Sequence, residues 1–315
     1  MSILIASQRD DVHAVSVRSA ILKNGFSDCF LIETDRISGF EALSLDISRN
    51  GAGGKVRAAE GRCIPLNDAR VLWMRRFSPN QRRHAGQKED ESQELIDNDC
   101  SGAISATLDI CFRGKWISDP DATIKASNKV YQLNVARQCG FRVPDTLITQ
   151  DRVEVIRFFE LHDGKVIVKP VVGMASRFLL TRSLEHPERI HEESYRTCPA
   201  IYQEYIPGTR HIRLNCFGDR SYAACIEAMD IDWRPDLNVR MRPWPVPDHV
   251  HVTVRKVLDK LGLAMGVIDI KEDPDSELVW LEVNPQGQFL FLEPLTGLKL
   301  TDHFAEFLIE EWRKV

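Results

Sequence analysis

The strongest chemical pattern in the sequence is a group of oxygen-bearing side chains near its C-terminal end. Asp269 lies in the apolar stretch 263–271, while Glu282 and Asn284 lie in the next apolar stretch. A turn-rich segment between the stretches predicts an antiparallel hairpin, in which alternate side chains share a face. A register that places Asp269 opposite position 280 or position 282 brings the three residues to one face. Such oxygen ligands favour Mg²⁺ or Mn²⁺, especially where phosphates supply the remaining ligands.

The alternative interpretation of this hairpin is a half-buried strand pair whose polar side chains face solvent. The following residues favour the metal site, because Asn284 is followed directly by the turn sequence Pro-Gln-Gly. A turn at this point would hold the Asn284 side chain rigidly. We therefore expect the three side chains to bind a divalent metal.

Two lysines have positions suited to nucleotide phosphates. Lys129 lies inside a predicted helix, and Lys169 ends a predicted strand just before Pro170. Lysines at strand ends beside glycine loops often contact phosphates as point charges. The loop 171–177 that follows has a single glycine, so an exposed lysine without a ligand is the alternative for Lys169.

Further candidates lie in and after the strand Gln203–Ile206, which ends at a Pro-Gly turn. The backbone of such a strand can hydrogen-bond an adenine edge while apolar side chains sandwich the ring. A plain linker strand is the alternative. Among the arginines of segment 207–242, Arg213 and Arg234 are candidates to stabilise charge that develops in phosphoryl or acyl transfer. The other arginines there fit a solvated basic loop.

Composition excludes several classes of protein. The 315 residues suffice for two or three domains, and 43% hydrophobic with 28% charged residues is ordinary for a globular protein. The net charge of −5 argues against a chain built for nucleic acid. No apolar run approaches the roughly 20 residues of a membrane helix. Eight cysteines without a CxxC pair predict reduced thiols in a cytoplasmic protein. Walker A, GxGxxG and nucleophile-elbow motifs do not occur in the sequence.

Apolar periodicity predicts the elements that must position these residues. A strand at 2–6, a helix at 11–24 and a strand at 29–32 predict an opening α/β domain with a parallel sheet. Further strands are expected at 69–74, 146–149, 166–169, 200–205, 212–217, 222–228, 264–271 and 278–284. Further helices are expected at 94–112, 119–144, 151–161, 248–261 and 301–313.

Several short motifs occur in order along the chain. They are Trp73-Met-Arg-Arg76, Asn128-Lys-Val-Tyr-Gln-Leu133, Gly140-Phe-Arg-Val-Pro-Asp-Thr146, Val168-Lys-Pro170, Gln203-Glu-Tyr-Ile206, Ile212-Arg213, Asp232-Trp-Arg234 and Leu281-Glu-Val-Asn-Pro-Gln-Gly-Gln288. This ordered set resembles the ATP-grasp superfamily, and in particular its RimK-like branch. Within that branch it resembles the microviridin-type (graspetide) peptide macrocyclases.

The resemblance implies an α/β (α+β) protein with the three-domain ATP-grasp fold and ATP held between the central and C-terminal domains. The implied domains are an N-terminal α/β domain at 1–118, a central ATP-grasp domain at 119–203 and a C-terminal ATP-grasp domain at 204–315. The loop 171–177 is the candidate lid, which would exclude water because an acylphosphate hydrolyses readily.

The resemblance also implies a role for each candidate residue. Contacts to ATP come from Lys129, Lys169, Gln203, Glu204, Tyr205, Ile206 and His211. His211 stands where the family often has an acidic residue. The implied ligands of Mg²⁺, or of Mn²⁺, are Asp269, Glu282 and Asn284. The implied catalytic residues are Arg213 and Arg234, which would stabilise an acylphosphate and the tetrahedral species.

The implied activity is ATP-dependent ligation of a carboxylate by an ADP-forming enzyme. A side-chain carboxylate of a ribosomal precursor peptide with a leader forms an acylphosphate, and a hydroxyl or amine of the same peptide closes an ω-ester or ω-amide ring. One alternative is a RimK-like ligase that adds amino acids to a protein or small-molecule carboxylate. Another is a non-catalytic protein that kept the fold, against which the intact site residues argue. Neither a nucleic acid nor a membrane is expected as a partner, and a homodimer is compatible with the sequence.

Overall fold

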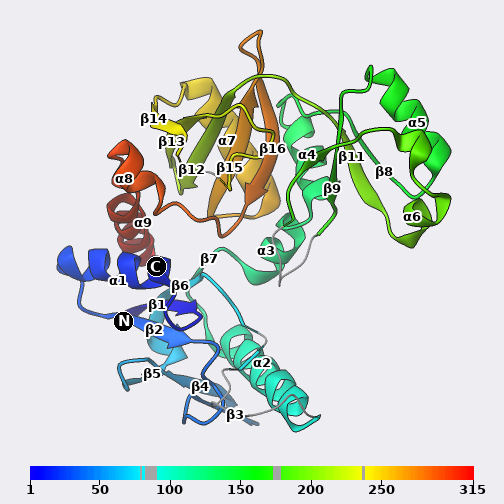
Figure 1. Ribbon diagram of the computed structural model, residues 1–315. Coiled ribbons are helices and arrows are strands. Elements are labelled where there is room, and N and C mark those ends of the chain that lie inside the picture. Colours follow the sequence, from blue (N-terminus) through cyan, green and yellow to red (C-terminus); the bar gives the residue numbers. More distant parts are fainter. Residues whose placement is uncertain (79, 82–90, 173–178, 236–237) are drawn as a thin grey trace. The chain divides into compact units, whose positions relative to one another are not determined.

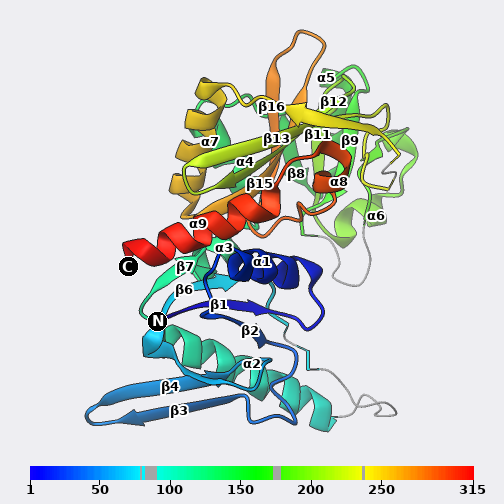
Figure 2. The same ribbon diagram turned by 90° about the vertical axis from the view of Figure 1, so that its left-hand side faces the viewer.

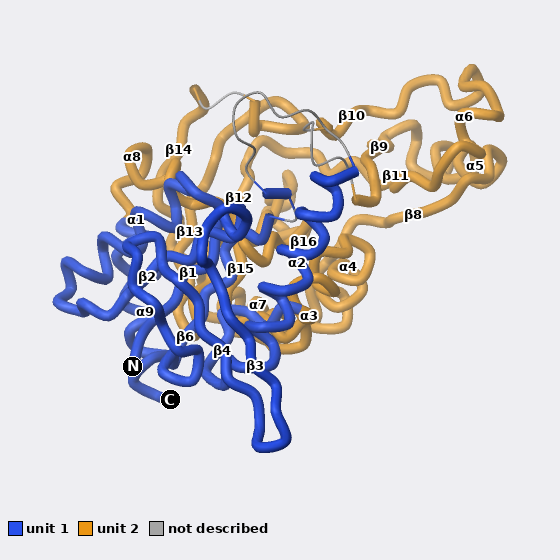
Figure 3. Tube along the Cα trace, turned by 90° about the horizontal axis from the view of Figure 1, so that it is seen from below, with its two compact units in different colours: residues 1–120, 299–315 blue, residues 121–298 orange. Residues whose placement is uncertain are grey.

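The structure is a computed structural model that describes residues 1–78, 80–81, 91–172, 179–235 and 238–315. The chain divides into two compact units, coloured separately in Figure 3. Unit 1 comprises residues 1–120 and 299–315, and unit 2 comprises residues 121–298. Each unit is described by itself below.

Unit 1 is built on a parallel sheet with the strand order β2-β1-β6-β7 (Figure 1). Its strands are β1 (Ser2–Ser7), β2 (Cys29–Glu33), β6 (Ala69–Met74) and β7 (Lys115–Ile117). Every residue of β1 is buried, as expected for a parallel strand that is covered on both faces. The parallel pairing of β1 with β2 confirms the predicted strand–helix–strand opening.

Helices cover both faces of this sheet (Figure 2). On one face lie α1 (Val12–Lys23) and α9 (Leu300–Lys314), which pack against each other. On the other lies α2 (Glu91–Cys111), with the short η1 (Leu66–Asp68). A small antiparallel sheet of β3 (Leu43–Ser48), β4 (Gly51–Arg57) and β5 (Cys63–Pro65) packs against α2. None of these three strands was predicted from the sequence, because β4 is rich in glycine and both β3 and β4 are largely exposed.

The C-terminal helix α9 belongs with the N-terminal sheet, whereas the sequence assigned it to a C-terminal domain. Its apolar face packs on β1 and β6, and the ring of Phe304 lies edge-on to Trp73 with centroids 4.7 Å apart. Near its end, Trp312 donates its indole N–H to the Met1 carbonyl at 3.1 Å. An amphipathic pattern predicts that a helix is covered on one side, but it does not identify the sheet that covers it.

Unit 2 contains two antiparallel sheets. The four-stranded sheet has the order β10-β9-β11-β8 and the five-stranded sheet the order β14-β13-β12-β15-β16. The strands are β8 (Thr146–Thr149), β9 (Val166–Pro170), β10 (Arg182–Ser183), β11 (Ala200–Glu204), β12 (Arg210–Phe217), β13 (Arg220–Glu227), β14 (Arg240–Trp244), β15 (Met265–Glu272) and β16 (Leu278–Asn284). The predicted boundary between 203 and 204 falls inside this unit and stays a prediction.

The helices of unit 2 flank these sheets. Beside the four-stranded sheet lie α5 (Arg152–Leu161), η2 (Pro187–Arg189) and α6 (Glu192–Thr197). The core of the five-stranded sheet includes side chains from α4 (Lys129–Gln138) and α7 (Asp248–Leu261). The remaining helices are α3 (Pro120–Ala126) and α8 (Leu292–Thr296).

The single helix predicted over 119–144 is two helices, α3 and α4. Asn128 separates them, and its side chain accepts hydrogen bonds from the backbone N–H groups of Val130 and Tyr131 at 3.0 and 3.1 Å. Asparagine is a favoured N-cap because it satisfies these otherwise unpaired donors. Lys129 is therefore the first residue of α4 rather than an interior one.

Candidate active site

The carboxylates of Asp269 and Glu282 face each other across β15 and β16. Of the two registers compatible with the sequence, the structure has Asp269 opposite Glu282. The pairing shifts just before Ile270, which is opposite Trp280, so that Leu281 is the extra residue of a β-bulge. Such bulges re-aim side chains. Here the bulge lets Trp280 enter the core while Glu282 faces Asp269.

Asn284 extends this face and is held by the predicted turn. Its backbone carbonyl accepts a hydrogen bond from Gly287 N at 3.2 Å, and its side-chain oxygen accepts one from Gln286 N at 3.1 Å. A Cβ atom at Gly287 would lie 2.4 Å from Cβ of Val267, so the turn lies too close to β15 for any larger residue. The sequence prediction that this turn fixes Asn284 is confirmed.

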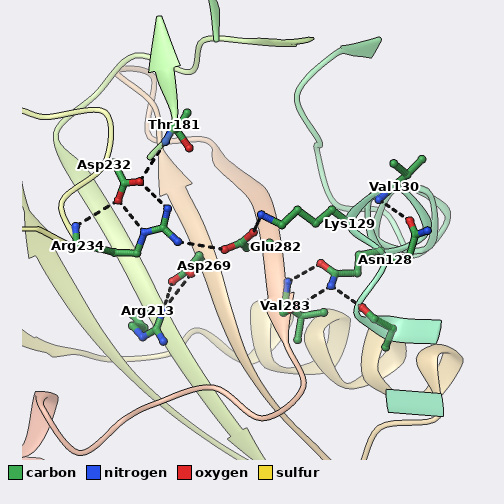
Figure 4. A network of polar contacts seen from close by, with 12 residues as sticks. Asn128, Lys129, Val130, Thr181, Arg213, Asp232, Arg234, Asp269, Glu282 and Val283 are labelled. Carbon is green, nitrogen blue, oxygen red and sulfur yellow. Dashed lines mark hydrogen bonds and ion pairs between the residues drawn. The ribbon is translucent and has the colours of Figure 1, made fainter. Parts of the chain in front are cut away.

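Each of the two carboxylates contacts a cation (Figure 4). Arg213 Nη1 lies 2.8 and 3.0 Å from the two carboxylate oxygens of Asp269. Lys129 Nζ lies 3.1 Å from Glu282 Oε2, and Arg234 Nη1 lies 4.0 Å from Glu282 Oε1. The two candidate arginines and one candidate lysine therefore converge on the candidate metal ligands.

Asp232 holds Arg234 in this place. Arg234 donates from Nε to Asp232 Oδ1 at 2.7 Å and from Nη2 to Asp232 Oδ2 at 2.5 Å. Asp232 also accepts a longer hydrogen bond from Thr181 N. This two-bond pairing fixes the plane of the guanidinium group. The motif Asp232-Trp-Arg234 by itself did not predict this role for Asp232.

Burial and the crowded charges shift the pKa values of the site in different directions. Burial raises the pKa of Asp269, and the neighbouring Glu282 charge adds to this, although Arg213 opposes both. Burial also acts to raise the pKa of Glu282, but Lys129 and Lys169 outweigh it and hold this pKa below its usual value. Burial lowers the pKa of Lys169 to about 8, with Glu282 opposing and Lys129 and Arg234 assisting. Charges that are held this closely are typical of functional sites.

The predicted nucleotide-binding residues line one pocket together with this cluster. Its lining includes Lys129, Lys169, Gln203, Glu204, Tyr205, Ile206 and His211. The Gln203 side chain is buried and donates to Thr146 Oγ1 at 2.7 Å. The Glu204 carboxylate accepts from Asp145 N at 3.1 Å and lies 3.4 Å from Arg142. The polar ends of both side chains are therefore engaged in hydrogen bonds within the protein. A ligand in the pocket would meet mainly the backbone of this strand and its apolar neighbours.

His211 is a buried, neutral wall of the same pocket. Burial lowers its pKa to about 4, with Lys271 lowering and Asp232 raising it. It lies opposite Lys271 across β12 and β15. The Lys271 ammonium is 5.2 Å from the centre of the Tyr205 ring. No motif in the sequence distinguishes a lysine at position 271, so Lys271 was not among the predicted site residues.

A second cavity of about 460 Å³ shares the acidic face with the first pocket. Arg213, Arg234, Asp269, Glu282 and Asn284 line it together with Trp233, Gln288 and Phe291. The Arg213 guanidinium lies 5.9 Å from the Trp233 ring centre and 5.6 Å from that of Phe291. The sequence prediction included Trp233 only as part of a motif, and it did not include Phe291. Between them, the two cavities are lined by all twelve candidate residues, whose individual roles stay predictions.

The donor set fits a magnesium ion that is shared with phosphates. Asp269 and Glu282 supply carboxylates and Asn284 an amide oxygen, the hard donors that Mg²⁺ prefers. Within the described residues, no three His, Cys, Asp or Glu side chains are grouped so that they alone could hold a metal. Phosphate oxygens and water would complete the coordination, as is usual for Mg²⁺ at nucleotide sites. Of the candidate lid at 171–177, residues 173–177 lie outside the described part of the chain.

No protein-family model matches the chain, but one sequence relative and several solved structures are similar to it. A sequence relative is the alpha-aminoadipate–LysW ligase LysX of Sulfurisphaera tokodaii, 25% identical over 220 residues, or 67% of this chain and 77% of LysX.

Two solved structures match nearly the whole chain. Macrocyclase MdnC of Microcystis aeruginosa, bound with precursor peptide MdnA, has a TM-score of 0.84 at 24% identity and covers 98% of this chain and 100% of its own. A RiPP-associated ATP-grasp ligase of Chryseobacterium gregarium, in complex with ADP and leader and core peptides, has a TM-score of 0.85 at 22% identity, covering 99% and 97%.

A RimK-domain ATP-grasp protein of Sphaerobacter thermophilus is more distant, with a TM-score of 0.59 at 14% identity over 98% of this chain and 100% of its own. The chain has the ATP-grasp fold. This confirms the predicted fold class, while the roles of the individual site residues stay predictions. In the described part of the chain, no helix is both long and apolar enough for a membrane span.

Proposed function

We propose that this protein is an ATP-dependent carboxylate ligase that closes ω-ester or ω-amide crosslinks within a ribosomal precursor peptide. The observation that carries the proposal is the acidic face shared by two cavities. One cavity is lined by residues 203–206 at the end of β11 and by lysines, which suit a nucleotide. The other has arginines and aromatic rings suited to a peptide side chain. The likeness to two ATP-grasp structures with bound peptides supports this interpretation.

In the first step, a side-chain carboxylate oxygen of the peptide attacks the γ-phosphorus of ATP. The bond from this phosphorus to the bridging oxygen breaks, and ADP leaves. Lys129 and Lys169 offset the charge of the phosphates, and positioning with charge stabilisation is most of what such a transfer needs. Mg²⁺ held by Asp269, Glu282 and Asn284 would neutralise phosphate charge.

In the second step, a hydroxyl or amine of the same peptide attacks the acyl carbon of the acylphosphate. The carbon–oxygen bond to phosphate breaks, inorganic phosphate leaves and the nucleophile loses its proton. Arg213 and Arg234 would stabilise this step, because a forked guanidinium can hold a carboxylate or the oxyanion of a tetrahedral species. Each ring removes one water from the peptide while ATP becomes ADP and phosphate.

The nucleotide and the compartment follow from the same proposal. Adenine is framed by the end of β11, at Gln203 and Glu204, together with Tyr205 and Ile206. The neutral His211 offers a ribose hydroxyl a hydrogen bond without charge.

All eight cysteines are free thiols. Free thiols support a reducing compartment such as the cytoplasm, where ATP is available.

Mass spectrometry of a candidate precursor tests the proposal. A short peptide encoded beside the gene, rich in Thr or Ser and Asp or Glu, is incubated with enzyme, ATP and Mg²⁺. We expect loss of one water mass per ring. Arg213→Ala should suppress this loss while leaving nucleotide binding largely intact, because Arg213 lines both cavities but contacts Asp269 and the aromatic rings of the second one. Arg240→Ala, at an exposed arginine paired with Glu227, is the matched control and should stay active.

A second candidate function is supported by the likeness to LysX, a ligase that joins alpha-aminoadipate to LysW. In that case a free amino acid is joined to a carboxylate, or a small acid to a carrier protein. The product would gain the mass of an added residue. Such a gain, without dehydration of any peptide, would favour this function over the macrocyclase.

A further inference from the structure

Gln132 is a buried polar side chain that the reaction described above does not use. It is 2% exposed and lies among the apolar residues of the unit 2 core. It follows Lys129 by three positions on α4, so the two side chains lie on the same side of the helix. Helix α4 packs against β16, the edge strand of the five-stranded sheet.

The amide of Gln132 pairs with both backbone groups of Val283, which is labelled in Figure 4. Gln132 Nε2 donates to Val283 O at 2.7 Å, and Val283 N donates to Gln132 Oε1 at 2.9 Å. Gln132 Nε2 also donates to the carbonyl of Ala126, at the end of α3. The side chain therefore hydrogen-bonds to the outer edge of β16 as a neighbouring strand would. The Arg142 carbonyl pairs with the same edge, accepting from Trp280 N at 2.9 Å.

Val283 lies directly between Glu282 and Asn284, where the regular pairing of β16 with β15 has just been interrupted. The bulge at Leu281 interrupts the pairing with β15 immediately before these residues. Rotation of a strand about its axis decides where its side chains point, since successive residues face opposite sides. Because the Gln132 amide hydrogen-bonds to both the N–H and the carbonyl of Val283, the backbone at 282–284 has little freedom to rotate.

The same helix also holds the charge of Glu282. Lys129 Nζ is 3.1 Å from Glu282 Oε2, while the Gln132 amide, three residues later, fixes the next backbone unit. Lys129 acts on the side chain and Gln132 on the backbone. Helix α4 therefore makes two separate contacts that orient the face of β16 carrying Glu282 and Asn284.

We propose that Gln132 is the positioning residue of the metal site, because its side-chain amide fixes the edge of β16 so that Glu282 and Asn284 face Asp269. The inference rests on the proposed function, which assigns these three residues to Mg²⁺. It goes further in attributing the geometry of the site to a residue that is not itself a ligand. Partners of this kind typically change metal affinity ten- to a hundredfold when they are removed.

The test separates metal binding from nucleotide binding in the full-length protein. Mn²⁺ serves as a spectroscopic probe, and its affinity in the presence of ADP is measured by electron paramagnetic resonance. ADP affinity is measured separately in EDTA. In Gln132→Met, which keeps the volume but has no amide, we expect Mn²⁺ affinity to fall about ten- to a hundredfold. Metal-free ADP affinity should stay unchanged, because Gln132 does not line either cavity.

Two variants serve as controls. Gln138→Met changes an exposed glutamine of the same helix, whose amide oxygen accepts from Lys260, and should bind Mn²⁺ like the wild type. Gln132→Glu keeps the acceptor for Val283 N but loses the donor to Val283 O. It should weaken Mn²⁺ binding as well, and it decides the matter if Gln132→Met fails to fold.

The outcomes distinguish this inference from the proposed function. Unchanged Mn²⁺ affinity in the folded Gln132 variants would overturn the positioning role, while loss of Mn²⁺ binding in Glu282→Gln would leave the proposed metal site standing. An equal loss of metal-dependent and metal-free ADP binding would mean that Gln132 only supports the fold, and this also overturns the inference. Wild-type protein that binds ADP with no Mn²⁺ dependence would overturn the metal site and the inference together.

Discussion

Both units bury carboxylates beside arginines, but they hold them differently. In unit 1, Asp11 accepts hydrogen bonds from Ser7 Oγ at 2.7 Å and from His13 N at 3.0 Å, and it caps α1. Arg75 and Arg76 each place Nε 3.7 Å from Asp11 Oδ2. Burial acts to raise the pKa of Asp11, but the Ser7 hydroxyl, the two arginines and the His13 N–H outweigh it and lower this pKa.

In unit 2, the contacts to the two carboxylates come from side-chain cations. Arg213 lies on Asp269, and Lys129 and Arg234 lie on Glu282. Among the described residues, no backbone N–H donates to either carboxylate as His13 N does to Asp11. Asp11 is thus held by a neighbouring hydroxyl and a backbone N–H as well as by arginines. Asp269 and Glu282 could exchange their contacts with side-chain cations for a metal and phosphates. Under the proposed function, this difference separates a structural cluster from a reactive one.

The largest effect should come from removing a charge on the reactive side. Glu282→Gln keeps the shape of the side chain but removes a charged metal ligand, so ATP turnover should fall by orders of magnitude. Thermal unfolding without ligands should change less than turnover does, because the cations beside Glu282 line a pocket that water can enter and solvate. Turnover is measured as ADP release with Mg²⁺. Near-normal turnover in this variant would remove Glu282 from the metal site.

The phosphate contacts should give a smaller effect. Lys169→Met and Lys129→Met each remove one cation from the pocket, and a hydrogen bond to a charged group is worth about 1.5–3 kcal/mol. ATP affinity should therefore fall roughly ten- to a hundredfold, as measured by calorimetry. Lys165→Met, at the exposed lysine before β9, is the matched control. If Lys165→Met weakens ATP binding as much as Lys169→Met does, a general loss of positive charge explains the result instead.

The sequence predicted best what depends on neighbouring residues. The alternation that brings Glu282 and Asn284 to one face, the turn after them and the strand before Pro170 are all local patterns. The bulge at Leu281 is not local, because it depends on Trp280 packing beside Phe141, with ring centroids 5.2 Å apart.

The missed residues act over long separations. Gln132 was part of a quoted motif, yet its hydrogen-bond partner Val283 is 151 positions away. Trp233 and Phe291 both line the second cavity. Trp233 was part of a quoted motif, but neither local sequence shows that it meets Phe291 there. The cap at Asn128, by contrast, was a readable signal that was not used, and it would have predicted that Lys129 begins a helix.

The smallest effect should come from the structural cluster, where loss of the carboxylate changes stability but not activity. Asp11→Ala removes the N-cap of α1, which typically costs about 0.5–2 kcal/mol, and it also removes the carboxylate that faces the buried Arg75. The N-cap variant Asp151→Ala on α5 is the matched control, because Asp151 caps by the same bond to Val153 N but is exposed. Denaturant unfolding at pH 7 should show a larger loss for Asp11→Ala, with ATP affinity unchanged in both.

The pH dependence of unfolding sharpens this last test. The pKa of Asp11 is lower in the folded protein than the ordinary value of 3.8, so the folded state binds its proton less readily than the unfolded state does. The resulting stability is fully present above the ordinary pKa and is lost as the pH falls through the folded pKa. The stability difference between wild type and Asp11→Ala should therefore shrink as the pH falls below about 4. A difference that stays constant down to that range would mean that Asp11 stabilises α1 without its charge, and the contrast between the two clusters would then rest on hydrogen bonding alone.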